Sequence, residues 1–152
     1  MTALANRVKR ARAVVDAGMV EVLRRKAGNR QRAWKMPSAS ILGSWYEVYA
    51  LFKRNGGAVR ASFLCNLCQP PLNEDAPVMQ KCQGNQRTVC YHCLAAMVKL
   101  AKGRRMTVQF VGSREKAQAL ARLGTVVEMH GEGQPNPSVW AVMRKRGRRK
   151  RT

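Results

Sequence analysis

The cysteines constrain this chain most strongly. Two Cys-x-x-Cys pairs, Cys65/Cys68 and Cys90/Cys93, are separated by a stretch that contains a fifth cysteine, Cys82. Cysteines at this spacing can bind one ion with both thiolates, and a structural zinc takes four such ligands at about 2.3 Å. Two disulfides are the alternative, but they would need an oxidising compartment and would leave one cysteine unpaired. We therefore predict one structural Zn2+ bound by Cys65, Cys68, Cys90 and Cys93.

The residues between the two pairs predict which zinc architecture forms. Gly84-Asn85 is a two-residue turn sequence between the β-type runs 78–83 and 86–91, so a β-hairpin is expected there. Residues 90–103 then show the apolar periodicity of a helix that ends in glycine. The order of Cys pair, hairpin and helix is typical of a treble-clef zinc finger, whose helix N-terminus helps to hold thiolates.

Two further potential ligands are expected to lie outside the site. With the hairpin turn at Gly84-Asn85, Cys82 and Cys90 face opposite sides of the hairpin, which makes Cys82 a spare thiol. His92 lies between two predicted ligands, which would turn its side chain outward to solvent.

Charge is the second strong constraint. The chain has 29 Lys and Arg against 8 Asp and Glu, a formal net charge of +21. Residues 1–35 hold ten basic and two acidic residues, residues 36–102 seven and three, and residues 103–152 twelve and three. Such a chain is expected to bind polyanions, because phosphate contacts that release counterions give affinity with little sequence preference. We predict RNA as the main partner.

The candidate RNA contacts are basic residues near the two ends of the chain. The run 144–151 cannot bury itself and is predicted to be a disordered clamp for nucleic acid, a nuclear-import signal, or both. The aromatic residues of the N-terminal half are expected mainly in the core, and only Trp34, which stands among basic residues, is a candidate for a base or phosphodiester contact. The basic candidates are Arg7, Arg10, Arg24, Arg25, Arg30, Arg32, Lys35, Arg104, Arg105, Arg144, Lys145, Arg146, Arg148, Arg149, Lys150 and Arg151.

The remaining patterns predict an α+β fold with N-terminal helices. An apolar stripe from Leu4 to Val22 predicts a helix over residues 3–26 that packs within the fold, and a homodimer through the same stripe stays possible. A second helix is predicted from Ser38 or Ser40 to Gly56-Gly57, followed by a strand. The later predicted elements are a strand at 106–111, a helix at 113–123, and strands at 125–129 and 138–143.

These elements divide the chain into four predicted regions. They are a basic helical region (1–57), a treble-clef-like zinc module with four cysteine ligands (58–103), a small α+β lobe (104–143) and a basic tail (144–152). No apolar run reaches the length of a membrane span, and the N-terminus lacks a hydrophobic signal core. We expect an intracellular, reducing location and no membrane partner. An Arg-rich amphipathic N-terminus is also compatible with a mitochondrial presequence.

The sequence does not indicate an active site. Its only histidines are His92 and His130, and neither is placed as the general base that a treble-clef nuclease needs. Glu74 and Asp75 are adjacent, so they cannot flank a substrate as an acid and base pair. We therefore expect a protein that is not an enzyme.

One family shares the zinc motif. Ser62-Phe63-x-Cys65-x-x-Cys68 and Val89-Cys90-x-x-Cys93 resemble the small zinc-binding first-frame proteins of sobemoviruses, over residues 60–102. The resemblance implies that the four cysteines take the ligand positions. It also implies a viral protein of the host cytoplasm or nucleus that suppresses RNA silencing and aids viral spread.

The expected function is that of a non-enzymatic, zinc-stabilised RNA-binding protein. Two alternatives stay open. One is a zinc-dependent adaptor that binds a host protein, and the other is a structural component of a ribonucleoprotein. Weak, salt-insensitive RNA binding would favour the adaptor, and co-sedimentation with ribosomal particles would favour the ribonucleoprotein.

Overall fold

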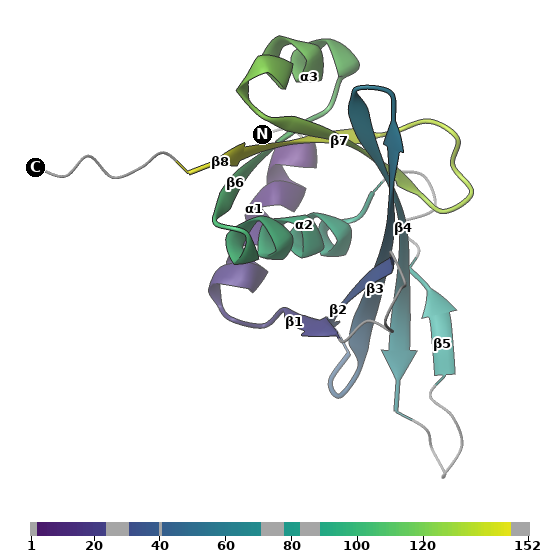
Figure 1. The fold of residues 1–152 in the computed structure, drawn as a ribbon. Helices are drawn as coiled ribbons and strands as arrows, with labels where there is room; N and C mark the ends of the chain where they lie inside the picture. The colour runs from purple at the N-terminus through teal and green to yellow at the C-terminus, as the bar shows by residue number, and fades with distance from the viewer. Residues whose placement is uncertain (1–2, 24–30, 40, 71–77, 83–88, 147–152) are drawn as a thin grey trace, which may run out of the picture.

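One curled, mixed β-sheet organises the chain (Figure 1). The computed structural model describes residues 3–23, 31–39, 41–70, 78–82 and 89–146. Its strands run in the order β1-β2-β3-β4-β7-β8-β6, and β5 pairs with β4. Strands β4 and β7 are parallel, and the other pairs are antiparallel. The strands are β1 (Glu21–Leu23), β2 (Gln31–Pro37), β3 (Trp45–Asn55), β4 (Ala58–Gln69), β5 (Val78–Lys81), β6 (Met106–Val111), β7 (Thr125–Gly131) and β8 (Val139–Lys145).

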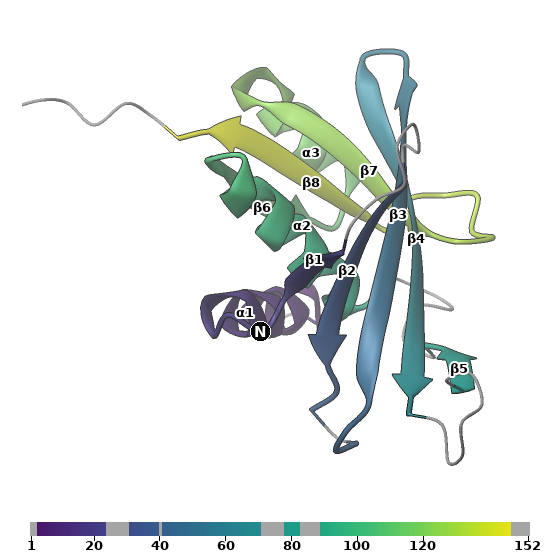
Figure 2. The same cartoon turned by 60° about the horizontal axis from the view of Figure 1, so that its bottom comes forward.

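Two helices pack against each other inside the curl of the sheet. They are α1 (Ala3–Asp16) and α2 (Tyr91–Gly103), and both lie on the same side of β2, β3 and β4 in Figures 1 and 2. A third helix, α3 (Arg114–Leu120), continues into the 3-10 turn η2 (Ala121–Leu123). It packs on the outer face of the sheet, where Ala117 forms a small separate apolar cluster with Val111 and Trp140.

The main core lies between α2 and the inner face of the sheet. Ala61, Phe63 and Cys65 alternate along β4 and are fully buried. This is the period-two pattern of a strand with one covered face. Helix α2 is buried from His92 through Val98, because α1 and the sheet enclose it. Helix α2 is therefore the central element of the fold.

Several sequence predictions are confirmed. The α+β class is correct, and Cys90 is the N-cap residue of the predicted helix at 90–103. Ser113 caps α3 by accepting a hydrogen bond from the Lys116 amide. The predicted elements at 106–111, 113–123, 125–129 and 138–143 correspond to β6, α3 with η2, β7 and β8.

The predicted second helix is wrong. Residues 45–55 form β3, which pairs with β4 along its whole length. Gly56-Gly57, taken as a helix end, is the two-residue turn of this hairpin, and Gly56 has a φ of 63° that glycine adopts without strain. Val48 and Ala50 are buried and alternate with more exposed neighbours. The aromatic and β-branched content of the segment favours this strand.

The N-terminal helix is shorter than predicted. It ends at Asp16 because Gly18 takes a φ of 71°, and the Gly18 amide donates to the Val15 carbonyl at 2.9 Å. Residues 21–23 then form β1 instead of a last helical turn. The apolar stripe from Leu4 to Val15 does pack into the main core, as expected. Val22, at its predicted end, is 61% exposed.

The sheet runs across the predicted boundary at residue 103. Residues 59–63 of β4 pair with residues 127–131 of β7, so strands of the predicted zinc module and C-terminal lobe share one sheet. Arg144 and Lys145 belong to β8, and residues 147–152 of the predicted tail lie outside the described residues. In the part of the chain that the structure describes, no helix combines the length and apolar character needed to cross a membrane.

Candidate metal centre

Strand β4 positions the first two sulfur atoms of a candidate metal centre. One edge of β4 pairs with β7 at residues 59–63 and with β5 at residues 66–69. Cys65 lies between these two pairings, and its carbonyl accepts a 2.9 Å hydrogen bond from the Cys82 amide. Because Cys82 directly follows β5, this bond holds it beside the inward-facing, fully buried Cys65.

The N-terminus of α2 supplies the other donor atoms. Cys90 has an extended backbone and precedes the first helical residue, and its carbonyl accepts the amides of Cys93 and Leu94 at 3.1 and 3.3 Å. The Cys90 and Cys93 Sγ atoms are 3.6 Å apart. His92 lies between these cysteines in the first turn. A helix N-terminus carries partial positive charge, which favours thiolates.

These side chains converge on one point. One ligand atom from each of Cys65, Cys82, Cys90 and His92 lies within 4.8 Å of the other three, and we refer to these four residues as the donor cluster. Cys82 is half-buried, whereas the other three are buried. Cys93 adjoins the donor cluster through Cys90 and is fully buried. Three sulfurs and an imidazole within this distance could surround one ion.

His92 is held in place by two aromatic rings and lies beside the Cys90 thiol. Its ring stacks on Tyr46 at 3.7 Å between centroids and lies 4.0 Å from the ring of Tyr91. The residue is 4% exposed, so the prediction of a solvent-facing His92 is wrong. Neither ring nitrogen has a hydrogen-bond partner among the described residues. Buried polar atoms are rarely left unpaired, and these nitrogens are available as donor atoms for a metal ion.

The thiols of the site influence one another's ionisation. Hydrogen bonds with Cys82, Cys90 and Cys93 raise the pKa of Cys65. Hydrogen bonds from Cys65, Cys82 and Cys93 lower the pKa of Cys90, so the first negative charge of the site belongs on the thiol at the helix N-terminus. Burial raises the pKa of Cys93. Further thiolates in this buried space would repel one another unless a cation compensated them.

The donor set fits zinc. Structural zinc sites are four-coordinate and use cysteine and histidine, and a set of three cysteines and one histidine is among the common combinations. The stacked ring of His92 is oriented by its aromatic neighbours, as a ligating imidazole needs to be. The residues present could therefore hold one metal ion.

The structure separates Cys68 from the other predicted ligands. Residues 65 and 68 belong to one continuous strand, and an odd separation along a strand places side chains on opposite faces. The Cys68 Sγ donates to Oε2 of Glu47 at 3.1 Å on the outer face. Of the four predicted ligands, Cys65, Cys90 and Cys93 come together, and Cys68 does not join them.

Cys82 lies close to Cys90, so the prediction that the two face opposite sides is wrong. The prediction placed it opposite Cys90 because it assumed a hairpin folded at Gly84-Asn85, which lies outside the described residues. Instead, β5 pairs with β4, and Cys82 reaches Cys65 through that pairing. The presence of a fifth cysteine near the two pairs was the available signal. The side to which Cys82 points depends on the pairing of β5 with β4, which no local sequence pattern reveals.

The predicted RNA contacts fall into three groups. Arg7 and Arg10 act within the fold: Arg7 Nη1 donates to the Val89 carbonyl at 2.5 Å, and the Arg10 guanidinium lies 4.3 Å from the Tyr91 ring. Arg32 and Arg104 line a groove at the C-terminal end of α2. Lys35, Arg105, Arg144, Lys145 and Arg146 are at least partly exposed, whereas Arg24, Arg25, Arg30, Arg148, Arg149, Lys150 and Arg151 lie outside the described residues.

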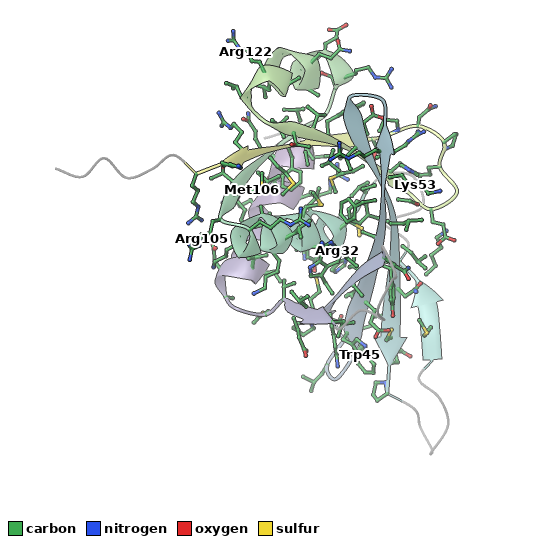
Figure 3. All side chains as sticks on the ribbon, in the orientation of Figure 1. Arg32, Trp45, Lys53, Arg105, Met106 and Arg122 are labelled. Carbon is green, nitrogen blue, oxygen red and sulfur yellow. The ribbon has the colours of Figure 1, made fainter. Side chains whose placement is uncertain are left out.

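Trp34 does not have the role that the sequence suggested. It is 1% exposed and packs into the main core, so it is not placed to stack on a base. The partly exposed Trp45 is contacted instead by Lys35, whose Nζ lies 4.7 Å from the ring. Figure 3 shows Trp45 near the end of β3 that is remote from the β3–β4 turn.

Comparisons of the chain with protein-family models, with curated proteins and with solved structures found no match. The resemblance to the sobemovirus proteins and the treble-clef arrangement therefore stay predictions.

Proposed function

We propose that this protein is a non-enzymatic RNA-binding protein whose fold is held by one structural zinc ion. The observation that supports RNA binding most is the charge, +21 with only 8 acidic residues in 152. A surface of mixed charges would serve solubility alone, but an excess this large favours a polyanion partner. Suppression of RNA silencing is the narrower role that the family resemblance implies.

For the metal we propose Cys65, Cys82, Cys90 and His92 as ligands. Their mutual distances and the unpartnered nitrogens of His92 support this set over the two Cys-x-x-Cys pairs. Cys93 then lies beside the ligating sulfur of Cys90, where its thiol can donate a hydrogen bond. The ion would compensate the thiolates and stabilise the junction of β4, β5 and α2, which is a structural role.

The test of RNA binding is a salt titration. Purified zinc-loaded protein is titrated against a single-stranded RNA, a double-stranded RNA of equal length and a duplex DNA. Phosphate contacts predict that log K falls linearly with log salt concentration, with a slope of about −0.7 to −0.9 per phosphate neutralised. Weak, salt-insensitive binding to all three nucleic acids would contradict the proposal and favour the adaptor.

A further inference from the structure

A groove opens at the C-terminal end of α2. Two adjoining hollows of about 320 and 270 Å³ share Arg32, Leu100 and Arg104. The larger hollow lies between the β3–β4 hairpin and the beginning of β6, and the smaller one extends towards β1. In Figure 3, Arg32 and Met106 lie beside α2, and Lys53 lies on the β3–β4 hairpin. The groove is therefore at the opposite end of α2 from the donor cluster.

The floor of the larger hollow is apolar. Phe52 and Met106 are partly exposed there, whereas Val127 and Met143 are buried beneath the surface. The Phe52 ring makes an edge-to-face contact with Phe63 at 6.4 Å between centroids, which fixes it against the core. An aromatic ring that is anchored but still reachable is the kind of surface on which a flat ligand can stack.

The walls of the groove are basic. Arg32, Lys99 and Arg104 line the two hollows, and a third hollow around Phe52 adds Lys53 and Arg54. None of the described residues that line these three hollows is acidic. The C-terminal end of α2 also carries partial negative charge, which favours the arginines gathered beside it.

We propose that this groove binds a single-stranded segment of RNA. The inference rests on the proposed function and names the site of binding within it. An unpaired base would lie on the apolar floor against Phe52, and phosphates on either side would contact Arg32 and Arg104. Proteins that bind single strands combine these two features, a basic groove for the backbone and an aromatic side chain for the base.

The apolar floor explains why the strand should be single. A duplex keeps its bases paired and stacked inside the helix, so it offers the floor only sugars and phosphates. Unpaired bases can be turned out and buried. The basic walls would attract either form of RNA, whereas Phe52 should act on the single strand alone.

Binding is measured by fluorescence anisotropy of a labelled single-stranded RNA and of its blunt duplex, with full-length protein at several salt concentrations. Phe52→Leu keeps an apolar side chain but removes the ring, so we expect single-strand affinity to fall about tenfold. Duplex affinity and the salt slope should not change. Leu51→Ala, on the opposite face of β3, is the matched control and should bind both RNAs as the wild type does.

The arginines should have a different signature. Arg32→Ala combined with Arg104→Ala removes about two phosphate contacts, so the single-strand salt slope should become shallower by about 1.4. The control, Lys116→Ala with Arg122→Ala, removes the same charge from exposed positions outside the groove and should change the slope less. Circular dichroism spectra establish that every variant is folded.

The outcomes separate the groove from the general proposal. Wild-type protein that binds RNA while the Phe52 and arginine variants bind it equally well would overturn the groove and leave RNA binding to other surfaces. Wild-type protein that binds no RNA would remove both proposals together. A loss of duplex and single-strand affinity alike in Phe52→Leu would also overturn base stacking in the groove.

Discussion

The two ends of helix α2 have opposite chemistry. At its N-terminus, Cys90 and His92 are buried among sulfur atoms, and the surrounding β4 and β5 place Cys65 and Cys82 against them. At its C-terminus, exposed Arg104 borders an open groove whose lining carries several cations and an apolar floor. Each end suits the sign of the helix dipole, with the lowered pKa of Cys90 at the positive end and arginines at the negative end.

This contrast indicates that the N-terminal end of α2 serves the stability of the fold and the C-terminal end serves binding of a partner. A closed cluster of soft donors can hold a metal tightly, but its burial leaves little surface for a macromolecular partner. An open basic groove can reach a polyanion, but it contributes few buried contacts to the fold. Because α2 is buried between α1 and the sheet, it can form a rigid connection between the donor cluster and the groove.

Loss of a ligand at the N-terminal end should have the largest effect. Cys65→Ser should prevent stable folding, because the binding free energy of a structural zinc, about 10–16 kcal/mol in zinc-finger peptides, becomes folding free energy. Cys68→Ser is the matched control, because the new hydroxyl could still donate to Glu47 and the donor cluster would stay intact. Thermal unfolding followed by circular dichroism compares the two variants. Equal destabilisation by both would contradict the ligand set.

The fourth ligand can be identified by replacing zinc with cobalt. Thiolate-to-cobalt absorption bands and d–d bands report the number of sulfur ligands in a tetrahedral site. His92→Gln should weaken metal affinity and alter the d–d bands, whereas Cys93→Ser should leave the number of sulfur ligands at three. A loss of thiolate absorption in Cys93→Ser, with an unchanged spectrum in His92→Gln, would instead identify Cys93 as the fourth ligand and exclude His92.

Arg7 ties α1 to the metal end of α2. Its guanidinium donates to the carbonyl of Val89, the residue before Cys90. Arg7→Ala should lower the free energy of unfolding by about 1.5 kcal/mol, since it removes a charged hydrogen bond to a partly buried carbonyl. Lys9→Ala, at an exposed position of the same helix, should have almost no effect in chemical denaturation. Weaker RNA binding without loss of stability in Arg7→Ala would instead support its predicted RNA contact.

The smallest effect concerns Cys68, whose thiol lies outside the donor cluster. Burial, together with the hydrogen bond to Glu47, raises the pKa of Cys68 from 9.0 to about 12. The neutral thiol is thus favoured in the fold, so its contribution to stability is complete below pH 9 and is lost as pH rises towards 12. Cys68→Ser should lose stability less steeply over this range in urea denaturation. A ligating Cys68 would instead ionise near neutral pH.

Much of this molecule follows from local sequence patterns. The strand at 106–111, the helix predicted at 113–123 and the helix predicted at 90–103 all formed, because neighbouring residues largely determine such elements. The candidate metal centre was predicted in part, since three of the four cysteines in the two pairs do converge.

The remainder depended on pairings between distant strands. The spacing of Cys65 and Cys68 is compatible with a turn in which both thiolates bind one ion. However, β3 pairs with β4 through residue 68, which keeps the segment extended. Cys82 enters the site through the pairing of β5 with β4, and Trp34 is covered by elements from elsewhere in the chain. The groove joins residues of β1, β2, β3, β4, α2, β6, β7 and β8, so no single segment carries its signature.

We propose that a metal ion at the N-terminal end of α2 maintains the RNA-binding groove at its C-terminal end. The most direct test is a chelator titration that follows bound zinc, circular dichroism and affinity for single-stranded and duplex RNA in the same samples. We predict that one zinc ion per chain is released, that the fold is lost with it, and that the preference for single strands disappears while charge-driven binding to both RNAs remains. A preparation without zinc that stays folded and still prefers single-stranded RNA would contradict the account.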